Sequence, residues 1–162
     1  MRRAQGAVRR GVTVLAVAGG LLSQGSLSAQ DGDAWDAPAR LVGLQLEQVI
    51  GTDGIEAGIT RYRLLRQSEP PEAFEEGMLN ALGYRLLRAE LVREATIVFQ
   101  LNVAQYPAAS NTYDSLGEAY FVAGDYLRAL ENYRRSVRLD PANGNGVMMI
   151  ERVRKAMRST LP

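Results

Sequence analysis

Few side chains that perform enzyme chemistry are present in this chain of 162 residues. It contains no histidine and no cysteine, so it lacks the usual general base of a serine hydrolase and the preferred ligands of zinc and iron. Its single lysine, Lys155, follows Arg152 by three residues, which excludes a Ser-x-x-Lys nucleophile. No Gly-rich phosphate loop of the common spacings occurs.

One carboxylate pair has a spacing compatible with acid–base catalysis. Asp114 and Glu118 stand four residues apart, on one face of a predicted helix, and two carboxylates can act as acid and base. The alternative, which we favour, is a solvated or ligand-facing helix edge. We therefore predict that the chain is not an enzyme and needs no cofactor or metal.

The segments that position these residues are predicted to be helical. From Ala39 onward, Leu, Ala, Glu and Arg dominate, and most Gly and Pro residues lie between the segments, as is typical of consecutive helices. The sequence therefore predicts an all-α fold.

A pattern of eight positions recurs after 34 residues, which is the signature of a repeat architecture. The later copy has Tyr113, Leu116, Gly117, Tyr120, Ala129, Tyr133, Ser136 and Pro141. The earlier copy has Leu79, Leu82, Gly83, Leu86, Ala95, Phe99, Asn102 and Pro107.

Small residues in this pattern predict close helix packing. Gly83 and Gly117 would let the second helix of a pair approach the first, and Ala95 and Ala129 would be small on the facing helix for the same reason. Large aromatic residues follow, and we expect Phe99 and Tyr133 to fill the wedge between one pair and the next.

Proline and glycine predict where the helices end. Pro107 and Pro141 lack an N–H donor and disfavour helix at the preceding residue. The turn inside the later pair has Gly124-Asp125, whereas the earlier pair has Glu90-Leu91 at the same place, which is poorer turn chemistry.

A third copy, 37 residues earlier, fits only in part. The matching positions are Val42, Val49, Gly58, Tyr62 and Pro70. The mismatches are Gln45, Leu46 and Leu65, with Leu46 at the place of the close-contact glycine. The extra residues fall between Pro70 and Glu76, so this copy is degenerate.

Residues 116–141, LGEAYFVAGDYLRALENYRRSVRLDP, resemble a tetratricopeptide repeat (TPR). More narrowly, LNALGYRLL, VFQLNVAQYP and NTYDSLGEAY resemble the small TPR tail of exported bacterial serine hydrolases of the β-lactamase-like class, here without the hydrolase. The resemblance implies a short α-solenoid of about three antiparallel helix pairs, residues 39–72, 76–109 and 110–143, with a capping helix at about 146–160. It also implies an interaction role.

In such a solenoid the first helix of each pair lines a concave binding groove. The resemblance places these residues there: Asn80, Tyr84, Leu87, Arg88, Asn111, Asp114, Glu118 and Phe121. Because Asp114 and Glu118 are acidic, we expect an extended peptide or a helix with basic and apolar features rather than an acidic tail. The alternative is that these side chains only pack one helix against the next.

The first 30 residues are predicted to be an export signal. Arg2, Arg3, Arg9 and Arg10 precede an apolar run, Val12–Leu22, and small polar residues follow, which is the order of a secretory signal. A basic arm is the alternative. Residues 31–38 form an acidic tether. Without a cysteine no lipoprotein anchor is possible, so we expect a periplasmic or secreted protein with no stable membrane anchor.

Charge and the last segment complete the prediction. Without the four N-terminal arginines, fifteen bases stand against eighteen acids, a net charge of −3, which argues against nucleic acid as a partner. Val147, Ile150, Val153 and Met157 form the predicted inward stripe of the capping helix. The expected partner is a protein or peptide. The alternative is a structural subunit that stacks end-on on itself, as a homo-oligomer, or on a separate hydrolase.

Overall fold

The computed structural model describes residues 37–159, and this part of the chain contains helices and no strand. The predicted export signal and residues 31–36 of the predicted tether lie outside the described residues. The elements are α1 (Ala37–Asp53), α2 (Ile55–Ser68), the 3-10 helix η1 (Pro71–Phe74), α3 (Glu76–Arg88), α4 (Val92–Gln105), α5 (Ser110–Val122), α6 (Tyr126–Leu139) and α7 (Gly144–Ser159).

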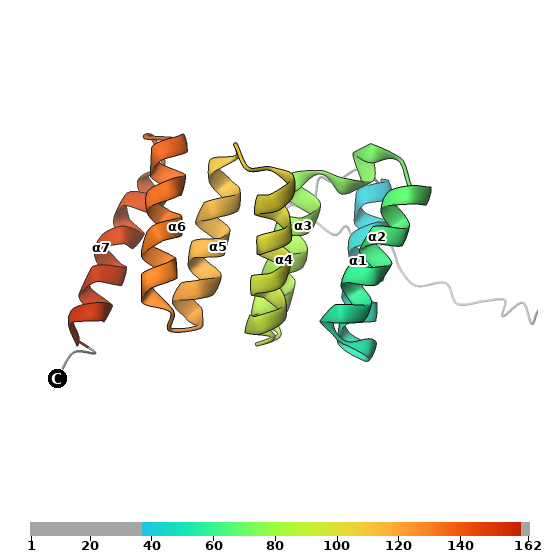
Figure 1. The fold of residues 1–162 in the computed structure, drawn as a ribbon, viewed down its shortest axis with the longest axis horizontal. Helices are drawn as coiled ribbons and strands as arrows, with labels where there is room; N and C mark the ends of the chain where they lie inside the picture. The colour runs from blue at the N-terminus through green and yellow to red at the C-terminus, as the bar shows by residue number, and fades with distance from the viewer. Residues whose placement is uncertain (1–36, 160–162) are drawn as a thin grey trace, which may run out of the picture. The chain divides into compact units, whose positions relative to one another are not determined.

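The helices form consecutive pairs. Within residues 37–159, α1 packs on α2, α3 on α4 and α5 on α6, and α7 packs on α6 at the end of the row (Figure 1). The second and third pairs are joined where α4 packs on α5. The all-α solenoid of three helix pairs with a terminal helix is therefore confirmed.

The repeated glycines make room for aromatic rings. A Cβ atom on Gly83 would lie 2.5 Å from two ring carbons of Phe99, and one on Gly117 would lie 3.1 Å from the ring of Tyr133. Both rings are buried, with 0% and 1% of their surface exposed. Each ring therefore lies over the glycine of its own pair. The close approach of the helices that we predicted at the glycines agrees with these distances. We expected the rings in the wedge between one pair and the next, but each contacts the glycine of its own pair.

The first pair reverses this arrangement. Leu46 on α1 stands in place of the close-contact glycine and is buried, whereas the small residue is Gly58 on α2. A Cβ atom on Gly58 would lie 2.3 Å from Cγ1 of Ile50. The large residue is thus on the first helix and the small one on the second, which explains why this copy looks degenerate in sequence.

The extra residues before α3 form η1, which changes the junction between the first two pairs. Phe74 is 1% exposed and meets Tyr62 edge-on, with ring centroids 5.6 Å apart. The guanidinium of Arg66 lies 5.0 Å from the centre of the Phe74 ring, and the hydroxyl of Tyr106 donates to its carbonyl. As a result the second pair meets the first where α3 packs on α1, with η1 packed on both, whereas α2 lies largely apart from α3.

The turns after α3 and α5 have the same geometry despite their different sequences. Glu90 adopts a φ of 62°, and Gly124 at the equivalent place adopts 76°. In both turns the next residue donates to a carbonyl five residues earlier, Leu91 to Leu86 and Asp125 to Tyr120, each at 2.9 Å. This is the Schellman pattern of a helix end, which favours glycine at the left-handed position.

The ends of the helical region differ in detail from the prediction. α1 begins at Ala37, inside the segment predicted as tether, and α7 begins at Gly144. The predicted inward stripe of α7 was wrong at Val147, which is 49% exposed. Gly146 is the buried residue there, because a Cβ atom at this position would lie 2.9 Å from side-chain atoms of Asn143 and Val137.

Candidate functional site

The predicted groove residues come from α3 and α5, and polar contacts join the two helices at successive turns. The hydroxyl of Ser115 donates to Oδ1 of Asn80 at 2.7 Å. One turn further along, the phenol of Tyr84 donates to Oε2 of Glu118 at 2.9 Å. The structure thus brings predicted residues of two repeats together, with Ser115 between them.

The same row continues toward the start of both helices. Nδ2 of Asn111 donates to Oε1 of Glu76 at 2.7 Å. Glu76, Asn80 and Tyr84 are spaced by four residues on α3, so they lie on one helix face. Glu76 and Ser115 were not predicted at this site. Their contacts join residues 35 apart, so they do not coincide with the 34-residue repeat.

Asp114 is held by residues that follow the repeats. Its Oδ1 accepts from Nδ2 of Asn143 at 2.8 Å, and its Oδ2 accepts from Nδ2 of Asn145 at 2.7 Å. Asn143 also donates to the hydroxyl of Ser136 at 2.8 Å. This carboxylate therefore connects α5 to the beginning of α7, and nothing in the repeat pattern predicted its partners.

A charged contact extends the row to the first pair. Nε of Arg85 on α3 donates to Oε2 of Glu47 on α1 at 2.5 Å, and both side chains are partly buried. The helices α1, α3, α5 and α7 are thus joined one to the next by polar side chains. We call this surface, formed by Glu47, Glu76, Asn80, Tyr84, Arg85, Asn111, Asp114, Ser115, Glu118 and Asn145, the first-helix face.

Asp114 and Glu118 give this face a negative charge that acts on the nearby tyrosines. Burial raises the pKa of Tyr84 to about 12, and the charges of Glu118 and Asp114 add to the increase. Burial also raises the pKa of Tyr133, again with contributions from Glu118 and Asp114. Tyr84 therefore keeps its proton at neutral pH and remains a hydrogen-bond donor to Glu118.

The apolar part of the predicted groove lies at the C-terminal ends of α3 and α5. Leu87 and Phe121 are half-buried, and Arg88 is exposed. Phe121 already has a cation beside it, since the guanidinium of Arg152 on α7 lies 5.3 Å from its ring centre. Arg152 was not predicted at this site because it belongs to the terminal helix, outside the repeats.

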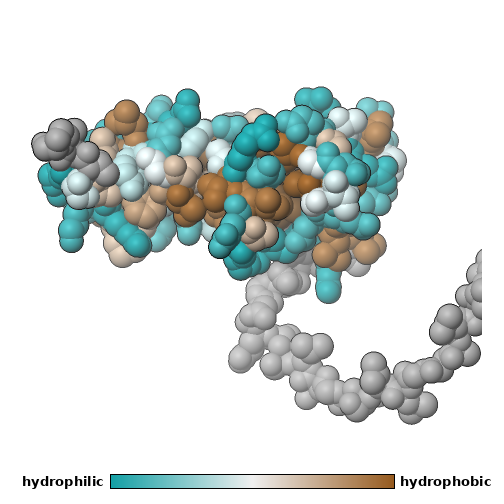
Figure 2. Space-filling view, turned by 90° about the horizontal axis from the view of Figure 1, so that it is seen from below, coloured by the Kyte–Doolittle hydropathy of each residue, from teal (hydrophilic) through white to brown (hydrophobic). Residues whose placement is uncertain are grey.

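Hydrophobic side chains also reach the surface near these helix ends. Leu91, in the turn after α3, is 36% exposed, and Val122, at the end of α5, is 55% exposed. In Figure 2, which looks at the helices from below, hydrophobic side chains gather across the middle of the molecule. Apolar side chains are therefore exposed near the C-terminal ends of α3 and α5.

The carboxylates of Asp114 and Glu118 are held by hydrogen bonds. They accept from two amides and a phenol, which fixes their positions. Residues 37–159 contain no group of three His, Cys, Asp or Glu side chains that could hold a metal ion. None of the helices in this range is both long and apolar enough to cross a membrane.

Comparison with solved structures identifies the fold. The first TPR domain of Spaghetti (RPAP3), bound to the HSP90 peptide SRMEEVD, is 17% identical and has a TM-score of 0.54, with 78% of this chain and 99% of that chain covered. The Sgt2 TPR domain from Aspergillus fumigatus is 15% identical, with a TM-score of 0.54 and coverage of 78% and 83%. For MamA the identity is 17%, the TM-score 0.52 and the coverage 75% and 66%.

No protein-family model matches the sequence, and no curated protein matches it. At identities of 15–17% the structural likeness establishes the fold and nothing beyond it. The chain therefore has the TPR fold.

Proposed function

We propose that this chain is an exported protein-interaction module whose first-helix face binds a segment of a partner protein with basic and apolar residues. The observation that carries this proposal is the pair of carboxylates, Asp114 and Glu118, fixed side by side on α5. Each oxygen that accepts one hydrogen bond retains a second lone pair, so an arginine or lysine of a ligand can still bind there.

The charge of this face determines the class of ligand. The solved RPAP3 domain holds a peptide, SRMEEVD, that contains three acidic residues. In the present chain, Asp114 and Glu118 would repel such a peptide and attract one of opposite charge. Val122, four residues after Glu118 on α5, and the half-buried Leu87, three residues after Tyr84 on α3, supply the apolar contacts.

Export is the second part of the proposal and rests on residues 1–30. Their order of arginines, apolar run and small residues is that of a cleaved secretory signal, and the bacterial partner would then be a periplasmic or secreted protein. Fractionation of cells that express the full chain tests this part. A product of full length in the cytoplasm would contradict it.

Isosteric substitution tests the binding site. We expect Asp114→Asn with Glu118→Gln to weaken binding of a fluorescein-labelled RLRFLR peptide by about tenfold, because charge-assisted hydrogen bonds are lost while the side-chain shapes remain. Fluorescence anisotropy at low and moderate salt measures the change. The matched control is Glu69→Gln with Glu72→Gln, two exposed carboxylates outside the face. Equal affinities in both double variants would refute the assignment.

End-on stacking on a second copy or on a separate hydrolase is the other candidate, and exposed apolar side chains favour it. Leu41 and Leu44 on α1 are 67% and 49% exposed, and Val147 and Met148 on α7 are 49% and 59% exposed. The end helices of a solenoid ordinarily have a polar outer face. Sedimentation of the wild-type chain over a range of concentrations tests self-stacking, which Met148→Gln is expected to weaken. A monomer at all concentrations would exclude self-stacking.

A further inference from the structure

A second groove lies on another face of α5, away from Asp114 and Glu118. Its volume is about 390 Å³, and its lining comes from α5 and α6. The lining residues are Tyr113, Tyr120, Arg128, Glu131, Asn132, Arg135 and Arg138. Three of them are arginines and one is a carboxylate, so the groove is basic although the first-helix face is acidic.

The guanidinium groups are held in place by aromatic rings. The guanidinium carbon of Arg128 lies 5.7 Å from the centre of the Tyr120 ring, and that of Arg135 lies 5.6 Å from the centre of the Tyr113 ring. Stacking on a ring orients an arginine and leaves its N–H donors available. Two arginines are thus preorganised along the groove.

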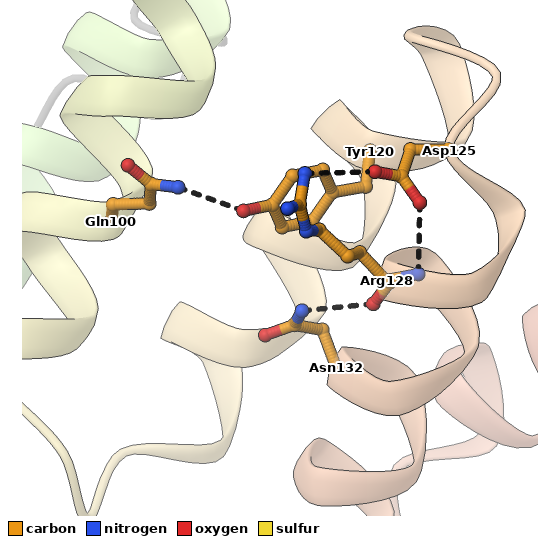
Figure 3. A network of polar contacts seen from close by, with 5 residues as sticks. All are labelled: Gln100, Tyr120, Asp125, Arg128 and Asn132. Carbon is orange, nitrogen blue, oxygen red and sulfur yellow. Dashed lines mark hydrogen bonds and ion pairs between the residues drawn. The ribbon is translucent and has the colours of Figure 1, made fainter.

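The Tyr120 end is fixed further by hydrogen bonds. Nε2 of Gln100, on α4, donates to the phenol of Tyr120 at 2.7 Å. Asp125 accepts from the backbone N–H of Arg128 at 3.1 Å and from its guanidinium at 3.0 Å. Figure 3 shows Tyr120 between Gln100 on one side and Arg128 on the other. This end of the groove is therefore built from three helices.

The positive charge of the groove is only partly balanced. Asp125 pairs with Arg128, but Arg135 and Arg138 form no ion pair within residues 37–159. An arginine presents its donors in a planar fork that matches a carboxylate. The groove therefore has unused donors of the type that bind carboxylates.

We propose that this groove binds an acidic, extended segment of a separate partner protein. Arg128 and Arg135 are seven residues apart on α6, which is about 10 Å along a helix. Three residues of polyproline-type extended chain cover about 9 Å. The bound segment accordingly has two carboxylates three residues apart, one for each arginine, and packs its apolar atoms on the two tyrosine rings.

A peptide fits this groove better than a nucleic acid does. Nucleic-acid binding requires an extended basic surface that follows many phosphates. Here three arginines line the groove, and Glu131 lies among them. A nucleic-acid backbone carries a negative charge at every nucleotide, so Glu131 would repel it. A peptide with two separated carboxylates can place them away from Glu131.

The test is fluorescence anisotropy with a fluorescein-labelled GDALDG peptide. We expect Arg135→Gln to weaken binding by about tenfold, since a charge-assisted hydrogen bond is lost, and we expect the GNALNG peptide to bind neither protein. The matched control is Arg134→Gln, because Arg134 is the exposed neighbour of Arg135 but does not line the groove. Asp114→Asn with Glu118→Gln should leave this affinity unchanged, which separates the groove from the first-helix face.

Three results would overturn the proposal. Equal losses in Arg134→Gln and Arg135→Gln would indicate attraction by the overall charge of α6 rather than binding in the groove. Tighter binding of a six-nucleotide thymidine oligomer than of GDALDG would indicate a nucleic-acid site. Self-association of the chain that Arg135→Gln abolishes would identify the occupant as another copy of this chain rather than a separate partner.

Discussion

Glu90→Gly is expected to stabilise the protein. Glu90 adopts a φ of 62° at the end of α3, and the equivalent residue after α5 is Gly124, with a φ of 76°. Both turns have the same pair of backbone hydrogen bonds. One of them therefore holds a residue with a Cβ atom in a conformation that favours glycine.

The magnitude follows from two opposing contributions. The left-handed conformation costs a residue other than glycine about 1–2 kcal/mol. Glycine also increases the entropy of the unfolded chain, which costs about 0.4–1 kcal/mol. The side chain of Glu90 is exposed and makes no hydrogen bond or ion pair within residues 37–159, so no contact is lost. The expected net gain is about 0.5–1 kcal/mol, or a melting temperature higher by about 2–4 °C.

Chemical denaturation and thermal melting followed by circular dichroism measure the change. The reference is Glu90→Ala, which removes the same charge but keeps a Cβ atom. The difference between the two variants therefore isolates the backbone conformation. Gly124→Ala is expected to be less stable than the wild type for the same reason. If Glu90→Gly were no more stable than Glu90→Ala, the argument from φ would be refuted.

Two further predictions follow from the same structure. Gly83→Ala is expected to cost about 1–3 kcal/mol and more than Gly117→Ala, since the added methyl would lie 2.5 Å from Phe99 but 3.1 Å from the facing ring at Gly117; urea denaturation of both variants checks this order. Because burial raises the pKa of Tyr84 from 10.0 to about 12, the unfolded chain loses this proton first, and stability falls as pH rises from 10 to 12. Denaturation curves across this range should show a smaller decrease for Tyr84→Phe.

The sequence predicted the repeated features because they depend on local contacts. Gly83 and Gly117 recur with the period of the helix pair, and Pro107 and Pro141 stand where second helices end. A proline ends the helix that precedes it, and a small residue admits a ring from the next helix, so both act within one helix pair. Such residues therefore reveal a repeat even in one sequence.

Side-chain partners from distant segments were not predictable in this way. The stripe predicted to face inward on α7 included Val147, which is exposed. The orientation of α7 depends instead on the close packing of Gly146 against Val137. In the first pair, Leu46 is buried opposite a helix whose small residue is Gly58. Each outcome depends on which surface the neighbouring helix presents, and a one-dimensional pattern does not contain that information.

The candidate site shows the same division. From the sequence alone, Tyr84, Asp114 and Glu118 were placed on first helices of neighbouring repeats, since helical spacing decides which residues share a face. Only the tertiary structure decided that Tyr84 donates to Glu118 and that Asn143 and Asn145 hold Asp114. Hydrogen bonds between residues about 30 positions apart form only after the helices have packed, so they are a consequence of the fold.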